Sequence, residues 1–245
     1  MKNAQTSGAH GPLGGAVLAM LLVGGTCGGQ TASPETYLSS LAGEMTRCWP
    51  TNRTVNLVCH GHSVPAGYFK TPVVDTFNAY PHLLHKALKE RFPNAVINVI
   101  VTAIGGENSE SGAKRFEQDV LALHPDLVTI DYGLNDRGLG LEGARAAWQQ
   151  MITSARSKGI RVLLLTPTPD LRAKLDDPQD PLNLHAAQIR SLAAQNGVAL
   201  IDSLARFRQA LQSGARLEDL MSQVNHPNRQ GHELVASELL KWFSH

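Results

Sequence analysis

The chain has 245 residues, of which 22 are basic and 21 acidic, together with ten histidines and three cysteines. A formal net charge of +1 argues against a strongly basic nucleic-acid-binding protein and against an acidic disordered tail. With 42% hydrophobic residues the chain can bury a substantial core, and its length fits a single α/β domain. We therefore expect a globular protein with no nucleic-acid partner.

The first thirty residues are expected to precede the folded domain. Lys2 is followed by a short apolar run, Leu13 to Val23, and then by small, glycine-rich residues. This run is too short to cross a hydrocarbon core of about 30 Å, but it has the length of the apolar part of a secretory signal. Residues 1–30 thus predict a signal peptide or disordered leader, and residues 31–245 a single domain that is exported (periplasmic or secreted) without stable membrane insertion.

The cysteines leave two questions open at this stage. Lipid attachment at Cys27 is the less favoured alternative to a soluble product, because Gly24 stands where a bulky aliphatic residue is expected. Cys48 and Cys59 could pair in an oxidising compartment. Cys59 lies in an apolar, strand-like run, however, which favours a free buried thiol over a disulfide.

Five β-prone segments alternate with helical patterns along the rest of the chain. The expected strands are 54–59, 95–101, 126–131, 160–165 and 198–201, and segment 95–101 has the β-branched, apolar character of a buried strand. Helices are expected from Ser33, from Pro81, around Phe116, and over 141–158, 184–195, 204–211, 217–221 and 233–243. This alternation predicts a flavodoxin-like α/β fold, a three-layer α/β/α sandwich around a five-stranded parallel sheet.

Chemistry in such sheets gathers in the loops that follow the C-terminal ends of the strands. Four segments there carry reactive side chains or glycine turns, although each taken alone also fits an ordinary turn. They are His60-Gly61-His62-Ser63, Gly105-Gly106-Glu107-Asn108, Gly133-Leu134-Asn135-Asp136 and Asn225-His226-Pro227. A serine hydroxyl is a weak nucleophile at neutral pH, and a histidine brought close to it by the fold could act as its base.

Together and in this order, the four segments resemble the SGNH (GDSL-like) hydrolase superfamily, over about residues 54–243. The resemblance implies the SGNH hydrolase fold and a serine esterase that uses no cofactor and no metal. It makes Ser63 the nucleophile and His226 the general base. It also implies an oxyanion hole formed by the backbone N–H groups of Ser63 and Gly106 and the side-chain amide of Asn135, donors of the kind that a tetrahedral intermediate requires.

Two positions depart from the pattern of the superfamily. His62 stands where an aspartate usually precedes the serine, and Gln223 stands three residues before His226, where the acid of the triad is expected. An amide oxygen could still orient the imidazole, but it cannot stabilise the imidazolium by charge. A Ser63–His226 dyad supported by Gln223 or by a main-chain oxygen is favoured, and Asp219 and Asp202 remain open as other partners.

The sequence predicts the substrate less specifically than it predicts the reaction type. Export and polar loops favour a carbohydrate O-acetyl ester or another short-chain acyl ester, with Tyr68 and Glu107 as candidate substrate contacts. Because of Gln223, a non-catalytic carbohydrate-binding protein remains an alternative. A metal-dependent hydrolase that uses His60 and His62 is another, since alternate residues of an extended chain can reach one ion. Other histidines, among them His232, are expected to be solvated or to cap helices.

Overall fold

The structure is a computed structural model that describes residues 1–5, 8 and 32–243. The predicted signal peptide and Cys27 therefore lie almost entirely outside the described residues. Within the described part of the chain, no helix is long and apolar enough to cross a membrane.

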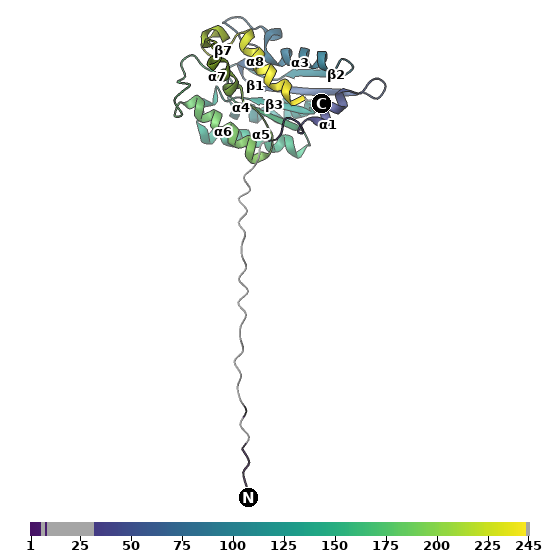
Figure 1. The fold of residues 1–245 in the computed structure, drawn as a ribbon, viewed down its shortest axis with the longest axis vertical. Helices are drawn as coiled ribbons and strands as arrows, with labels where there is room; N and C mark the ends of the chain where they lie inside the picture. The colour runs from purple at the N-terminus through teal and green to yellow at the C-terminus, as the bar shows by residue number, and fades with distance from the viewer. Residues whose placement is uncertain (6–7, 9–31, 244–245) are drawn as a thin grey trace.

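A five-stranded parallel sheet forms the centre of the molecule, with the strand order β2-β1-β3-β4-β5 (Figure 1). This confirms the predicted fold class. The strands are β1 (Thr54–Gly61), β2 (Val96–Val101), β3 (Leu127–Asp131), β4 (Arg161–Leu165) and β5 (Ala199–Ile201). The prediction that segment 95–101 is a buried strand is wrong: β2 lies at the edge of the sheet and Val96 is 47% exposed. Its β-branched residues suit a half-covered pleated surface as well as a buried one.

Helices cover both faces of the sheet (Figure 1). One apolar cluster, with Leu57, Leu84 and Phe243, lies on the side of α1 (Ser39–Met45), α3 (Tyr80–Arg91), α7 (Ser203–Gln212) and α8 (Arg229–Leu240). The other cluster, with Ile130 and Trp148, lies on the side of α4 (Ser109–Asp119), α5 (Leu141–Ser157) and α6 (Pro181–Asn196). The predicted three-layer arrangement is therefore present.

Several short elements differ from the expectation. The first helix begins at Ser39, and residues 34–38, expected to be helical, form turns. Segment 217–220 is a 3₁₀ helix, and a helical turn, α2 (Ser63–Ala66), and an antiparallel hairpin of β6 (Met221–Gln223) and β7 (His226–Pro227) were not predicted. These elements are too short to produce a periodic pattern. The remaining 3₁₀ helices are Thr76–Asn78, Leu121–Leu123, Asp136–Gly138 and Lys241–Phe243.

The strand order makes the C-terminal end of β1 a topological switch point. The chain leaves β1 toward α3 on one face and returns from β2 through α4 on the other, so the loops after β1 and β3 diverge. Such switch points are where open α/β sheets bind ligands. Ser63, Gly106 and Asn135 follow β1, β2 and β3, the three adjacent strands at this point.

Both cysteines described by the structure are free. Cys48 is exposed and Cys59 is buried, as predicted for an unpaired thiol in the first strand. Burial raises the pKa of Cys59 to about 12, so this side chain stays a thiol at neutral pH and is not a nucleophile.

Candidate active site

Ser63 and His226 meet although they are far apart in the sequence. Ser63 is the first residue of α2, directly after β1, and His226 lies on β7. The Ser63 Oγ is 2.9 Å from His226 Nε2, and each residue is 6% exposed. A hydroxyl and an imidazole at this distance can exchange a proton, which is the first requirement for a serine nucleophile.

The other nitrogen of His226 faces a main-chain oxygen. Its Nδ1 lies 2.9 Å from the carbonyl oxygen of Phe69 and 2.7 Å from the amide nitrogen of Gln223. The Gln223 amide oxygen is turned away, because it accepts from the N–H and the hydroxyl of Thr71 at 3.1 and 3.3 Å. The acceptor for an Nδ1 proton is thus Phe69, while Asp202 is bound to Arg190.

The two neighbours of His226 Nδ1 favour opposite tautomers. A proton on Nδ1 donates to Phe69 O and leaves Nε2 free to accept from Ser63. A proton on Nε2 would instead let Nδ1 accept from the Gln223 amide, and only the first tautomer can act as a base toward serine. Burial lowers the pKa of His226, and the charge of a protonated His62 would lower this pKa further, whereas the Phe69 carbonyl opposes the shift.

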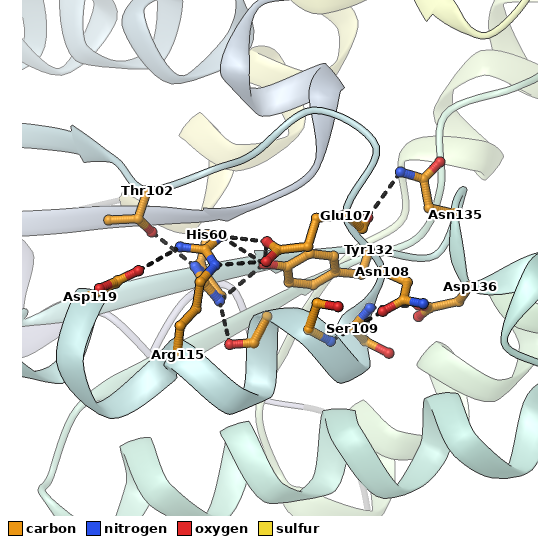
Figure 2. Close-up of polar contacts among 12 residues, drawn as sticks. His60, Thr102, Glu107, Asn108, Ser109, Arg115, Asp119, Tyr132, Asn135 and Asp136 are labelled. Atoms are coloured by element: carbon orange, nitrogen blue, oxygen red, sulfur yellow. Dashed lines mark hydrogen bonds and ion pairs between the residues drawn. The ribbon is translucent and has the colours of Figure 1, made fainter.

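Hydrogen-bond donors lie on the loops that follow β2 and β3, the two strands that pair with β1. Gly106 is exposed and has a φ of +82°, a left-handed conformation that favours glycine. Among the described residues, neither the Ser63 N–H nor the Gly106 N–H donates to a main-chain carbonyl. The Asn135 amide donates one N–H to the carbonyl of Glu107 at 2.9 Å (Figure 2), and its second N–H remains available. These are the donors that an oxyanion requires.

Glu107 turns its carboxylate away from Asn135 into an internal polar cluster (Figure 2). Arg115 Nε donates to Glu107 Oε1 at 2.8 Å, and the Tyr132 hydroxyl donates to Oε2 at 2.9 Å. The Tyr132 hydroxyl in turn lies 3.0 Å from His60 Nε2. Because its side chain is only 9% exposed and both carboxylate oxygens are bound in this cluster, Glu107 anchors the loop that follows β2. Its contact with substrate stays a prediction.

Changing Glu107 to Gln is expected to lower both stability and turnover. The change replaces the carboxylate that faces the Arg115 guanidinium with a neutral amide, while the exposed Asp119 stays paired with Arg115. Weakening a charged, largely buried hydrogen bond costs about 1–3 kcal/mol. Turnover should fall because the loop that holds Asn135 loosens. Urea unfolding and p-nitrophenyl acetate hydrolysis measure the two effects.

The matched control is Glu110→Gln, on an exposed side chain of α4 that pairs with Lys114. Its effect on the free energy of unfolding should stay within about 0.5 kcal/mol. Equal losses of stability in the two variants would show that the Glu107 cluster does not anchor the loop.

His60 and His62 face different partners, which argues against the metal-dependent alternative. His60 contacts the Thr102 hydroxyl at 2.9 Å and the Gly112 carbonyl at 3.2 Å, and burial lowers its pKa to about 4. His62 instead lies beside Asp131. Among the residues that the structure describes, no group of three or more His, Cys, Asp or Glu side chains could hold a metal ion.

Tyr68 lies at the exposed rim of the site. Its ring centroid is 6.1 Å from that of His226, and a side chain at Gly105 would meet the Tyr68 ring at 2.8 Å. The ring therefore packs on Gly105 next to His226, with 38% of the residue exposed. This position suits the predicted role in substrate contact.

Several contributors to the site carried no usable signal in the sequence. The carbonyl of Phe69 is a main-chain group, so no side chain could reveal it. His232, expected to be solvated or to cap a helix, is buried: its Nδ1 accepts from the Tyr80 N–H at the start of α3 at 3.2 Å, and its ring stacks on Phe69 at 5.2 Å. Burial lowers the pKa of His232 to about 3, so a neutral ring supports Phe69.

Comparisons with known proteins agree with this architecture. Residues 59–234 match the model of the GDSL-like Lipase/Acylhydrolase family. An acetylxylan esterase from Geobacillus stearothermophilus is 22% identical over 166 residues, which span 63% of this chain and 75% of the relative.

Solved structures share the fold. The crystal structure of Axe2, an acetylxylan esterase from the same organism, has a TM-score of 0.69 at 20% identity, with 78% of this chain and 94% of that chain covered. LAE5, an alpha/beta hydrolase enzyme from the metagenome of Lake Arreo, has a TM-score of 0.68 at 22% identity, with 81% and 97% covered. The family match removes the non-catalytic alternative. The chain belongs to the GDSL-like lipase/acylhydrolase family and is an ester-hydrolysing enzyme.

Proposed function

We propose that the enzyme is a serine esterase that removes acetyl or other short acyl groups from carbohydrates. The observation that carries the mechanism is the 2.9 Å hydrogen bond between Ser63 Oγ and His226 Nε2. The similarity to an acetylxylan esterase supports an acetylated carbohydrate as the substrate.

In the acylation step, Ser63 Oγ attacks the ester carbonyl and its proton passes to His226 Nε2. The Phe69 carbonyl accepts a hydrogen bond from the Nδ1–H of His226, which holds the imidazole in the tautomer that can act as a base. The N–H groups of Ser63 and Gly106 and the Asn135 amide stabilise the negative charge on the carbonyl oxygen. His226 then protonates the departing sugar alkoxide.

In the deacylation step, water takes the place of the sugar. His226 accepts a proton from the water as it attacks the acyl carbon, and the same donors hold the second oxyanion. The proton then returns to Ser63 Oγ when acetate leaves, so no cofactor enters the cycle.

The substrate proposal is tested by an acyl-chain series of p-nitrophenyl esters together with acetate release from acetylated xylan and acetylated xylooligosaccharides. We expect the highest kcat/KM for acetyl esters and release of acetate from the carbohydrates. A preference for chains longer than about eight carbons, without acetate release, would contradict the proposal, since each added methylene changes binding measurably.

Replacing Gln223 with Asp is expected to raise kcat by about tenfold or more. An amide in place of the triad acid costs about 10⁴-fold in a serine protease, and the Phe69 carbonyl offsets part of that loss here. The carboxylate would remove the amide that favours the unproductive tautomer and would add charge beside the imidazolium. Turnover of p-nitrophenyl acetate by purified variants measures the gain.

Gln223→Ala is the control for this gain, because it removes the same amide without adding charge. Its turnover should rise less than that of Gln223→Asp, because it removes the donor that favours the unproductive tautomer but adds no charge. Unchanged or lower turnover of Gln223→Asp, with the fold retained by circular dichroism, would mean that the missing acid does not limit this enzyme.

The pH profile of kcat/KM should reflect the buried imidazole. Because burial lowers the pKa of His226, its neutral, active form persists to lower pH than for a histidine in water, with its pKa of about 6.5. We expect the acidic limb of the wild-type profile below that value. In Gln223→Asp the limb should move to higher pH, since a nearby carboxylate favours the imidazolium. A limb at or above the ordinary value in the wild type would contradict the assignment of His226 as base.

We also propose that the enzyme is exported. The support is the apolar run Leu13 to Val23 after Lys2, and an acetylated polysaccharide is a substrate found outside the cell. N-terminal sequencing of the mature protein tests this: a start near residue 30 is expected, and a retained Met1 would contradict it. A lipid-modified Cys27 as the first residue would instead support the lipoprotein alternative.

A further inference from the structure

A second imidazole lies beside the hydroxyl of Ser63. His62 Nδ1 is 3.4 Å from Ser63 Oγ, and the His62 side chain is 1% exposed. The N–H of Val64 donates to the same Nδ1 at 3.3 Å and so caps α2. An Nδ1 that accepts this bond is unprotonated, so the proton of the neutral ring is on Nε2.

This second imidazole is backed by a carboxylate. His62 Nε2 lies 3.5 Å from Asp131 Oδ1, and the Asp131 side chain is 3% exposed. Gly61 pairs with Asp131 across β1 and β3, and a side chain at Gly61 would come within 2.5 Å of the Asp131 carbonyl, so glycine permits this close approach. The Tyr80 hydroxyl donates to the other oxygen of Asp131 at 3.2 Å.

The two groups depend on each other. Among the described residues, neither His62 Nε2 nor Asp131 Oδ1 has a hydrogen-bond partner, and these two unsatisfied atoms lie 3.5 Å apart. A buried carboxylate is costly unless it is compensated. The chain therefore keeps an acid at a histidine next to Ser63, while Gln223 leaves His226 without one.

We propose that His62, backed by Asp131, is a second proton acceptor for Ser63 during acylation. The proposal rests on the proposed role of Ser63 as the nucleophile. The Oγ–H proton moves to His62 Nδ1, which gives up its long bond from Val64 N–H. The Oγ–C bond forms as the carbonyl π electrons move onto oxygen, and collapse of this intermediate breaks the C–O bond to p-nitrophenolate, which leaves as the anion. The proton stays on His62 until it returns to Ser63 Oγ when the acyl-enzyme is hydrolysed. The Asp131 carboxylate stabilises the His62 imidazolium that results, because it faces the proton on His62 Nε2.

The burial of His62 separates its role from that of His226. His62 is 0% exposed, so it can take a proton from Ser63 but cannot deliver one to a sugar alkoxide or activate a water molecule. A p-nitrophenolate leaves without protonation. His226→Ala should therefore still acylate with p-nitrophenyl acetate, and then stall because deacylation requires a base in contact with water.

The experiment measures the pre-steady-state burst of p-nitrophenolate by stopped flow. His226→Ala should give a burst equivalent to one product per enzyme, followed by slow turnover. In the His226→Ala protein, a second change, either His62→Asn or Asp131→Asn, should slow the burst about tenfold or more. The side-chain oxygen of the new Asn at position 62 can still accept from Val64 N–H. Adding His185→Asn, at a buried histidine on α6, is the matched control and should leave the burst rate unchanged.

The outcomes separate the role of His62 from the role of Ser63. A burst that is absent in His226→Ala, or one that His62→Asn and Asp131→Asn leave unchanged in proteins with wild-type circular dichroism, would overturn the proposal. A burst that persists in the Ser63→Ala/His226→Ala variant would instead remove Ser63 as the nucleophile. That outcome would refute the proposed mechanism as a whole, and so it is distinguishable from failure of His62 alone.

Discussion

Replacing Ser63 with Ala is expected to lower kcat for acetyl ester hydrolysis by about 10⁴-fold or more. The change removes the oxygen that would form the acyl-enzyme, and the 2.9 Å hydrogen bond to His226 Nε2 disappears with it. His226 could still activate water weakly, and the oxyanion donors would remain, so a small residual rate is expected. Steady-state hydrolysis of p-nitrophenyl acetate by purified protein measures the effect.

The control for this variant is Ser237→Ala, at an exposed serine on α8 whose hydroxyl bonds only to its own helix. Its kcat should equal that of the wild type. The Ser63→Ala protein should stay folded and lose only about 1 kcal/mol of stability, because the change removes one buried hydroxyl and its bond to His226. Turnover by Ser63→Ala within tenfold of the wild type would place the nucleophile elsewhere.

Replacing Asn135 with Ala is expected to lower kcat by about 10² to 10³-fold, the usual cost of removing one oxyanion donor. The second N–H of this amide would bond the substrate oxygen mainly once it carries negative charge, so KM should change little. Asn135→Asp should lose as much, because it keeps the shape of the side chain but replaces the donor with an acceptor. The full dependence of rate on p-nitrophenyl acetate concentration separates kcat from KM.

Asn98→Ala serves as the control for Asn135, since Asn98 lies on the edge strand β2 and bonds Asn56. It should leave both kinetic constants unchanged. If Asn135→Ala raised KM and left kcat intact, Asn135 would bind the ground state of the substrate and would not belong to an oxyanion hole.

The fold was predictable because its main elements carry long apolar patterns. Residues 141–158 and 160–165 match α5 and β4 within a residue or two, since helical periodicity and continuous burial mark them clearly. Position within the sheet was not predictable in the same way. The apolar residues of β2 predicted a buried strand, but the crossover connections place β2 at the edge of the sheet. The sequence of one strand does not determine the order of strands in a sheet.

The site was predictable only where it consists of side chains in recognisable segments. Ser63 and His226 could be named from the sequence, and the structure brings their side chains together. The acceptor for His226 could not be named, because the Phe69 carbonyl is a main-chain group that reaches the imidazole through a loop. The hairpin that carries Gln223 and His226 pairs too few residues to leave an alternating pattern.

The orientation of buried polar side chains was the least predictable feature. Glu107 follows Gly106 in the loop after β2, where it could have faced solvent, yet Arg115 and Tyr132 bind its carboxylate inside the protein. Asp131 ends an apolar strand, and its partner His62 follows a different strand. Such pairings depend on the register between strands, which fixes which side chains meet across the sheet.

Trapping of the acyl-enzyme tests the assignment of Ser63 most directly. Wild-type protein is mixed with excess p-nitrophenyl acetate, quenched in acid during turnover, digested with trypsin and analysed by mass spectrometry. We predict an acetyl group on the peptide of residues 54–70, in which Ser63 is the only serine, and none on this peptide in Ser63→Ala. An acetyl group that forms at the rate of turnover on another residue, or turnover that continues in Ser63→Ala, would contradict the proposed mechanism.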